Sequence, residues 1–180
     1  YGMVVTRTLV TTADESTWPK DKNTPVLFLG EWCKLYSRKD SWEVLDYVVQ
    51  PYHWDNRTKF KKDYYYLDGL YESVLLDLSN HLNRFHTVNY SLRYWRILLG
   101  PWLGVFIQTI FDRWSILNTA INSNTIKKCF VLDKDFHTLI PKTTHEFNSM
   151  ILDDYWNEAM FSQLIDKCFQ KDVLVIKIPC

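Results

Sequence analysis

Three clusters of polar side chains follow short apolar runs near the N-terminal end of the sequence. The clusters are Asp14-Glu15-Ser16, Glu31-Trp32-Cys33, and His53-Trp54-Asp55 with Arg57 close behind. Each contains a side chain that can accept a proton, and activation of a hydroxyl group needs Asp, Glu or His within hydrogen-bond reach. The clusters therefore indicate general acid–base chemistry on a hydroxyl-bearing substrate.

Glu31 is the leading candidate for a general base because it comes one residue beyond Gly30, which closes an apolar run. A carboxylate at that position can instead satisfy free amides at the start of a helix. His53 is the second catalytic candidate, and a local hydrogen bond within a loop is its alternative role. Asp14 and Glu15 can contact substrate, or they can stabilise a turn through side-chain hydrogen bonds to the backbone.

Two arginines, Arg93 and Arg96, stand three residues apart at the start of an uncharged, largely apolar run over 97–111. They fall on one face of the expected helix. They could bind a phosphate or a sugar-acid carboxylate, or pair with a carboxylate of the protein. We expect the run itself to be a helix that is buried by protein and interrupted at Gly100-Pro101, too short to cross a bilayer.

Aromatic residues are abundant, with 8 Trp, 11 Tyr and 10 Phe. Tryptophan and tyrosine rings serve either core packing or stacking on sugar faces. We assign Trp32, Trp54, Asp55 and Arg57 to substrate binding, together with the acidic and arginine candidates above. No metal-ligand spacing is present, and we expect no metal site. Cys33 could be a nucleophile at a helix start or a buried, inert thiol.

The bulk composition excludes some classes of protein. Lys+Arg and Asp+Glu both number 21, so no net charge favours nucleic acid. The four cysteines form no C-x-x-C pair, and we see neither a signal-peptide pattern nor a transmembrane stretch. We therefore expect a cytoplasmic protein with reduced thiols.

The candidate residues are positioned by alternating strands and helices. We predict strands over 3–11, 25–30, 46–50, 129–132 and 173–178. We predict helices over 59–86, over 91–117 with the break noted above, from Thr143, and again from Asp153, with 118–124 as a polar terminator. This order predicts an α/β, Rossmann-like domain with a mainly parallel sheet and a helix-rich insertion. Ligands bind beyond the carboxyl ends of such strands, where the three clusters fall.

Four stretches resemble the N-terminal motifs of a transferase family found in bacterial O-antigen and surface-carbohydrate gene clusters. The stretches are Thr11–Pro19, Leu27–Cys33, Asp46–Asp55 and Ser91–Trp102. The resemblance covers residues 3–118 well and the remainder loosely. Members of that family are longer, and we expect residues 1–180 to be a single domain and a fragment of a longer chain.

The resemblance implies a glycosyltransferase-like enzyme of surface-polysaccharide assembly, such as that of lipopolysaccharide, with no firm catalytic residue to carry over. In a two-domain, GT-B-like architecture this chain would be the N-terminal half that binds the glycan acceptor. The nucleotide-activated sugar donor would bind the missing half, and this chain would need no cofactor. Peripheral association with the inner membrane is compatible with this role. The alternative is a non-catalytic carbohydrate-binding or scaffolding domain of a surface-glycan assembly complex.

Overall fold

The computed structural model of the protein describes residues 5–134 and 136–179. The chain divides into two compact units. The sheet unit contains the residues up to Tyr52 and those from Arg113 onward, and the hairpin unit contains His53–Asp112. The hairpin unit thus interrupts the sheet unit in sequence.

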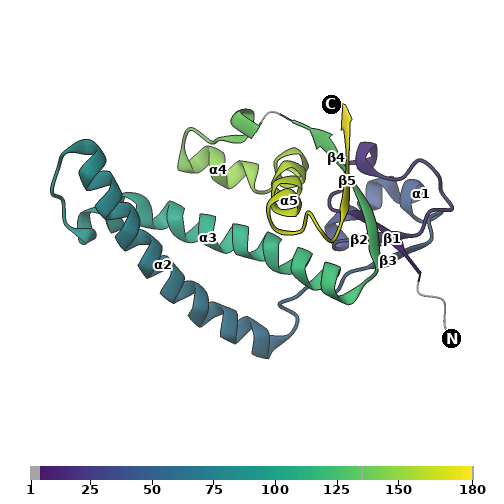
Figure 1. Cartoon of the computed structure of the whole chain (residues 1–180), viewed down its shortest axis with the longest axis horizontal. Helices are drawn as coiled ribbons and strands as arrows, with labels where there is room; N and C mark the ends of the chain where they lie inside the picture. The colour runs from purple at the N-terminus through teal and green to yellow at the C-terminus, as the bar shows by residue number, and fades with distance from the viewer. Residues whose placement is uncertain (1–4, 135, 180) are drawn as a thin grey trace. The chain divides into compact units, whose positions relative to one another are not determined.

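The sheet unit is built on five parallel strands (Figure 1). The strands are β1 (Arg7–Val10), β2 (Val26–Phe28), β3 (Tyr47–Val49), β4 (Ile126–Asp133) and β5 (Leu174–Pro179). Their order in the sheet is β3-β2-β1-β4-β5, with Leu9 of β1 opposite Leu27 on one side and Cys129 on the other. The predicted α/β class is confirmed, and the sheet within the described residues is entirely parallel.

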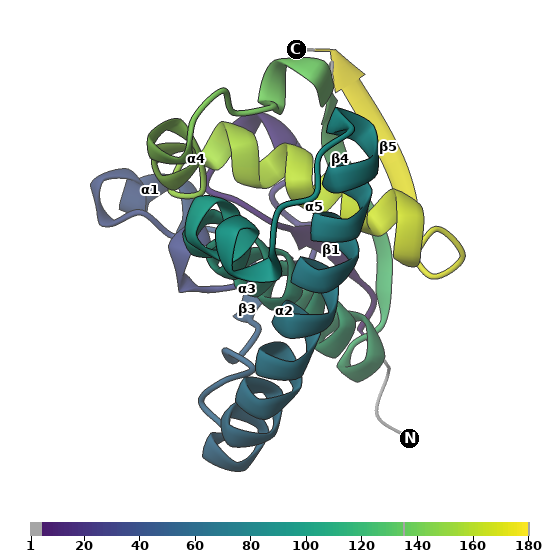
Figure 2. The same cartoon turned by 90° about the vertical axis from the view of Figure 1, so that its left-hand side faces the viewer.

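Both faces of this sheet are covered, which explains why its central strands are apolar runs without alternation. On one face Leu9, Leu27 and Cys129 pack against helix residues such as Ile116 and Ile165. Those residues belong to the end of α3 (Leu92–Ser123) and to α5 (Asp154–Cys168), and Figures 1 and 2 both show α5 beside β4.

The opposite face is covered by short elements that follow β1 and β2. These are the 3₁₀ turns η1 (Glu15–Thr17), η2 (Glu31–Cys33) and η3 (Tyr36–Arg38), and helix α1 (Lys39–Trp42). Trp18, Cys33 and Trp42 pack there against Val10 and Phe28. Two further elements, η4 (Phe136–Leu139) and α4 (Thr144–Met150), connect β4 to α5.

The hairpin unit consists of α2 (Arg57–His86) and the first part of α3, joined by a short turn. Asn56 caps α2 by accepting a hydrogen bond from the Lys59 amide, and Thr87 ends it in the left-handed region with φ of 54°. Asn83 braces the turn, because its side-chain amide donates to the Tyr90 carbonyl and accepts from the Tyr90 amide. The core of this unit contains Leu67, Leu75, Leu103 and Ile107.

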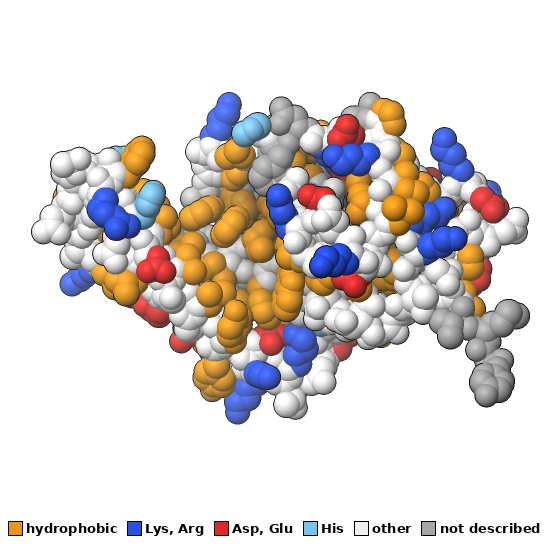
Figure 3. Space-filling model, in the orientation of Figure 1, with side chains coloured by type: hydrophobic (Ala, Val, Ile, Leu, Met, Phe, Trp, Pro, Cys, Tyr) orange, Lys and Arg blue, Asp and Glu red, His pale blue; other side chains and the backbone are white. Residues whose placement is uncertain are grey.

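Helix α3 corrects three of the sequence predictions. It continues through Gly100-Pro101 without a break. Pro101 removes the amide that would bond the Ile97 carbonyl, and both residues lie at the surface, where water can replace that partner. The run over 97–111 is not enclosed, since Ile97 and Leu98 are 71% and 59% exposed. Apolar side chains reach the surface over the hairpin in Figure 3.

The third correction concerns the end of α3, which lies at Ser123 and not at Leu117. Asn122 donates a side-chain hydrogen bond to the Asn118 carbonyl, so these polar residues stay within the helix, while Ala120 continues its buried face. None of the helices in the described ranges is both long and apolar enough to cross a bilayer.

The remaining boundaries differ from the predictions by a few residues. Strand β4 is longer than the predicted 129–132, and β1 is shorter than 3–11, of which residues 3 and 4 lie outside the described part. Helix α4 starts where predicted: Thr143 caps it by accepting a hydrogen bond from the Glu146 amide, and the Glu146 carboxylate accepts one from the Lys142 amide. Helix α5 also starts where predicted, with Asp153 as its cap.

Candidate functional site

The carboxyl ends of β1 and β2 bring two of the three predicted clusters together. The Trp32 indole nitrogen donates to the Thr11 carbonyl over 2.9 Å, and the Cys33 thiol lies 3.6 Å from the Val10 carbonyl. In the observed sheet the strand order reverses between β1 and β4, and ligands of open parallel sheets bind beside that switch point. This edge of the sheet unit is therefore the position where the fold favours a ligand-binding site.

Gly30 allows the Trp32 ring to lie where it does. A Cβ atom at residue 30 would stand 2.1 to 2.4 Å from atoms of the Trp32 ring, closer than any van der Waals contact. Gly30 has an extended backbone, so the requirement is for space and not for an unusual φ angle. The glycine that closes β2 thus holds an indole, partly exposed, across the end of the strand.

The turn after β1 carries opposite charges. Asp14 caps η1 by accepting hydrogen bonds from the Ser16 amide and hydroxyl, which is the turn role anticipated for it. Arg38 donates to the Ala13 carbonyl over 3.1 Å, and its guanidinium lies 3.9 Å from the Glu15 carboxylate. A fixed cation is therefore held over a turn that also carries two carboxylates.

A third carboxylate reaches this turn from the start of α5. Burial raises the pKa of Asp154 above its usual value, and a hydrogen bond from the Ala13 amide partly opposes that rise. The negative charges of Asp153 and Asp14 raise the pKa further, while Arg38 lowers it. A carboxyl group whose pKa is raised accepts a proton more readily than an ordinary aspartate, which is the property a general base needs.

Asp154 lines a small cavity of about 230 Å³ within the sheet unit. The cavity is also lined by Trp32, Arg113, Ile151, Leu152, Asn157 and Phe161. The Arg113 guanidinium donates to the Asn157 side-chain carbonyl over 3.0 Å and to the Ile151 carbonyl over 3.3 Å, so its orientation is fixed. The cavity combines a proton acceptor, a cation and an aromatic surface.

A buried ion pair anchors α5 beside the end of β4. Lys134 Nζ lies 2.7 Å from Glu158 Oε2, and the two side chains are 2% and 0% exposed. The Leu132 amide donates to Glu158 Oε1, and Lys134 donates to the Tyr155 carbonyl. Glu158 Oε2 lacks a well-aligned hydrogen bond despite the short contact, so charge alone holds that end of the pair. The pair fixes the helix turn that carries Asp154.

The leading base candidate, Glu31, lies at the first position of η2 with its side chain exposed to solvent. Its carboxylate is 2.9 Å from the Lys34 ammonium. Cys33 is buried, and burial raises the pKa of its thiol to about 12. The structure thus favours the inert alternative for this cysteine.

The third predicted cluster begins the hairpin unit. His53 is buried, with its Nε2 atom 3.0 Å from Asp112 Oδ1. The Trp54 indole nitrogen donates a hydrogen bond to the Asp63 carboxylate, which also accepts one from the Lys59 ammonium. Asp112 and Asp63 both belong to the hairpin unit, so these contacts hold the cluster within that unit.

The remaining candidates lie along the hairpin helices. Asp55 and Arg57 are exposed at the start of α2, and Arg93 is exposed near the start of α3. Arg96 makes a two-pronged contact with the Glu72 carboxylate at 2.5 and 2.6 Å, and this lowers the pKa of Glu72. Of the two roles considered for Arg96, pairing with a carboxylate of the protein is thus observed. Its role in binding an anionic ligand stays a prediction.

Sequence reasoning did not assign functional roles to four residues of the sheet unit. Arg38, Arg113, Asp154 and Asn157 all contribute to the turn or to the cavity. No local signal distinguished them, since an acidic residue directly after a helix cap, as Asp154 is, is common in the first turn of helices. Within the described ranges no group of three or more His, Cys, Asp or Glu side chains could hold a metal ion.

Comparison with known proteins agrees with the transferase interpretation. No curated protein and no solved structure matches the chain. A match to the LIC12162 family transferase extends over residues 7–178, which reaches all five strands of the sheet and includes the whole hairpin unit. Because this match covers nearly the full sequence, the chain belongs to the LIC12162 transferase family.

Proposed function

We propose that this chain is the acceptor-binding part of a glycosyltransferase, of the two-domain GT-B type, that builds bacterial surface polysaccharide of the O-antigen kind. The family description supports transfer of a group. The observation that carries the proposal is the Asp154 carboxyl, with its raised pKa, in a cavity beside Trp32 and Arg113 at the carboxyl edge of a parallel sheet.

In the proposed reaction Asp154 takes the proton from a sugar hydroxyl of the acceptor. The acceptor oxygen then bonds to the anomeric carbon of the donor, and the bond from that carbon to the nucleotide breaks with the electron pair leaving on phosphate oxygen. Trp32 offers a flat apolar surface to the acceptor ring. Arg113, whose guanidinium is already oriented by Asn157, stabilises negative charge as the reaction proceeds.

The proposal assigns the nucleotide-sugar donor to a second part of the protein and the reaction to the cytoplasmic side of the inner membrane. Glu31 and His53 remain secondary candidates. Glu31 is reachable from solvent and could deliver or receive a proton. His53, buried against Asp112, is better placed to position its neighbours than to contact substrate.

Transfer by the full-length protein tests this assignment. The protein is incubated with UDP-, GDP-, dTDP- and CMP-activated sugars and a lipid-linked glycan fraction, and nucleotide release is measured. Asp154→Asn should lower the rate by about 10²- to 10⁴-fold, the usual contribution of a general base. Asp166→Asn, on an exposed position of the same helix, is the matched control and should leave the rate unchanged.

Two outcomes would overturn the assignment. Wild-type transfer by Asp154→Asn would remove Asp154 as the base, and a large loss in Glu31→Gln would transfer that role to Glu31. Absence of turnover with every donor, combined with retained binding of a glycan, would favour the non-catalytic binding domain.

A further inference from the structure

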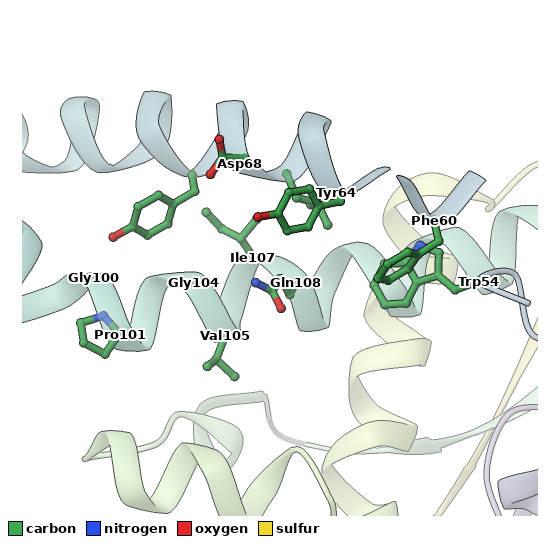
Figure 4. Close-up of a pocket in the computed structure, with 12 residues that line it drawn as sticks. Trp54, Phe60, Tyr64, Asp68, Gly100, Pro101, Gly104, Val105, Ile107 and Gln108 are labelled. Atoms are coloured by element: carbon green, nitrogen blue, oxygen red, sulfur yellow. The ribbon is translucent and has the colours of Figure 1, made fainter. Parts of the chain in front are cut away.

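The hairpin unit contains a cavity that the proposed reaction does not use. It lies between α2 and α3, has a volume of about 520 Å³, and all of its lining residues belong to His53–Asp112. Figure 4 shows Trp54 and Phe60 at one end, Gly100 and Pro101 at the other, and Tyr64 and Gln108 between them. Its volume is within the range of small-molecule sites, about 300 to 1,000 Å³.

Trp54 is held rigidly at its end of this cavity. Its indole nitrogen donates to Asp63 over 3.0 Å, which fixes the ring about its long axis. Phe60 meets the ring edge-on at 5.7 Å between centroids, and Phe111 stacks on it at 6.4 Å. The indole is nevertheless partly exposed. A ring that is oriented before a ligand arrives loses little conformational entropy on binding.

Two glycines of α3 accommodate Tyr71 at the other end. A Cβ atom at Gly100 would lie 2.6 Å from the Tyr71 hydroxyl, and one at Gly104 would lie 3.9 Å from the Tyr71 ring. The Tyr71 ring therefore lies across a helix surface without side chains. Arg96 stands 5.9 Å from the centre of that ring and is itself held by Glu72, which fixes this wall of the cavity.

Two polar side chains of the lining, Asp68 and Gln108, are unengaged within the described ranges. The side chains of Asp68 and Gln108 make no hydrogen bond or ion pair with other residues in the part of the chain that the structure describes. Asp68 supplies the charge of the lining, and it is negative. A nucleotide or other phosphate-bearing ligand would be repelled by it, whereas a neutral ligand with hydroxyl groups could donate hydrogen bonds to both side chains.

We propose that this cavity is a sugar-binding subsite. The apolar C–H face of a pyranose ring stacks on Trp54 and Tyr64, and hydroxyl groups at its rim donate to Asp68 and Gln108. This inference deepens the proposed function, since the ring belongs to the glycan acceptor. It also differs from that function, because the subsite binds sugar without taking part in proton transfer.

Saturation-transfer NMR on the full-length protein tests the proposal. The probes are N-acetylglucosamine, galactose and rhamnose at up to about 50 mM, with farnesol and UDP as contrasting ligands. We expect saturation of the ring protons of at least one sugar. Trp54→Ala should weaken the binding of that sugar about tenfold or more, since loss of the aromatic ring removes both apolar burial and ring contact.

A pair of glycine variants supplies the matched control. Gly104→Leu fills the cavity and should abolish the sugar binding that depends on Trp54. Gly69→Leu makes the same change on α2, where an added Cβ meets nothing within 4 Å, and should leave binding intact. The transfer rate of Asp154→Asn is measured separately, so failure of this inference and failure of the proposed reaction give different results.

Three results would overturn the inference. The first is the absence of saturation for every sugar at the highest concentration. The second is sugar binding that survives both Trp54→Ala and Gly104→Leu. The third is displacement of the sugar by farnesol, together with farnesol binding that survives Trp54→Ala but is lost in Gly104→Leu, which would identify a lipid chain as the occupant.

Discussion

Replacing Lys134 by methionine should destabilise the sheet unit strongly. The change keeps most of the side-chain volume and removes the charge, leaving the Glu158 carboxylate buried with one hydrogen bond, from the Leu132 amide. Breaking a buried ion pair from one side costs about 3–5 kcal/mol, because the remaining charge stays out of water. In a chain of this size that loss lowers the unfolding temperature by roughly 6–20 °C.

The chain offers a matched control for this variant. Lys177 pairs with Asp133 over 3.4 Å, also between neighbouring elements of the sheet unit, but these side chains are 69% and 63% exposed. Exposed pairs contribute about 0–1 kcal/mol, so Lys177→Met should have little effect. The double variant Lys134→Met/Glu158→Gln should recover most of the lost stability, because the amide can still accept from Leu132 and no charge is left buried.

Urea unfolding followed by tryptophan fluorescence measures all of these variants. The expected order of stability is wild type and Lys177→Met together, then the double variant, then Lys134→Met. Equal, small losses in Lys134→Met and Lys177→Met would refute the reasoning, since a solvated Lys134–Glu158 pair would behave in that way. A double variant no more stable than Lys134→Met would show that packing, and not charge, explains the loss.

Three further outcomes are expected. Gly30→Ala should cost about 1–3 kcal/mol in urea unfolding and change the fluorescence of Trp32, since the ring must leave its place and lose its hydrogen bond; an unchanged spectrum would contradict this. Asp154→Asn should raise the unfolding midpoint at pH 7, because burial raises the carboxyl pKa above its unfolded value and the cost of the charged form grows as pH rises through the folded pKa. That gain should vanish in unfolding curves taken below about pH 4, near the usual pKa of Asp. Mass-spectrometric mapping of alkylation at pH 8 should find Cys168 labelled quickly and Cys33 only on unfolding, because burial raises the Cys33 pKa to about 12.

The position of Trp32 at the end of β1, where it contacts Thr11, could be predicted from sequence because both residues follow buried strands. Parallel strands end at a common edge, so residues that come directly after neighbouring strands meet without any further information. The same rule could not place His53. It follows β3 in sequence but begins the hairpin unit, where its partner is Asp112, fifty-nine residues away. No local pattern predicts a pairing of that sequence separation.

The continuity of α3 shows a different limit of local signals. Gly100-Pro101 is a strong breaker in isolation, yet the helix continues because the lost hydrogen bond falls on the exposed side, where water can substitute. The expectation of full burial was wrong for a related reason. The absence of charge over 97–111 predicts apolar contacts, but only one face of the helix packs on α2, through residues such as Leu103 and Ile107.

Three polar residues in the first turns of α5 share a pattern that periodicity alone would reject. Asp154, Asn157 and Glu158 stand at positions i, i+3 and i+4 of α5, so they fall on one face of the helix. That face is turned inward, since Glu158 is buried, Asp154 meets the turn after β1, and Asn157 holds Arg113. A helix that serves packing alone would carry apolar residues at such positions. Burying polar residues on an inward face costs free energy unless each has a hydrogen-bond or charge partner. Such pairing requires the strand ends to be in place first. This departure from the apolar pattern, more than any single residue type, supports the proposal that the start of α5 contributes to the site in the sheet unit.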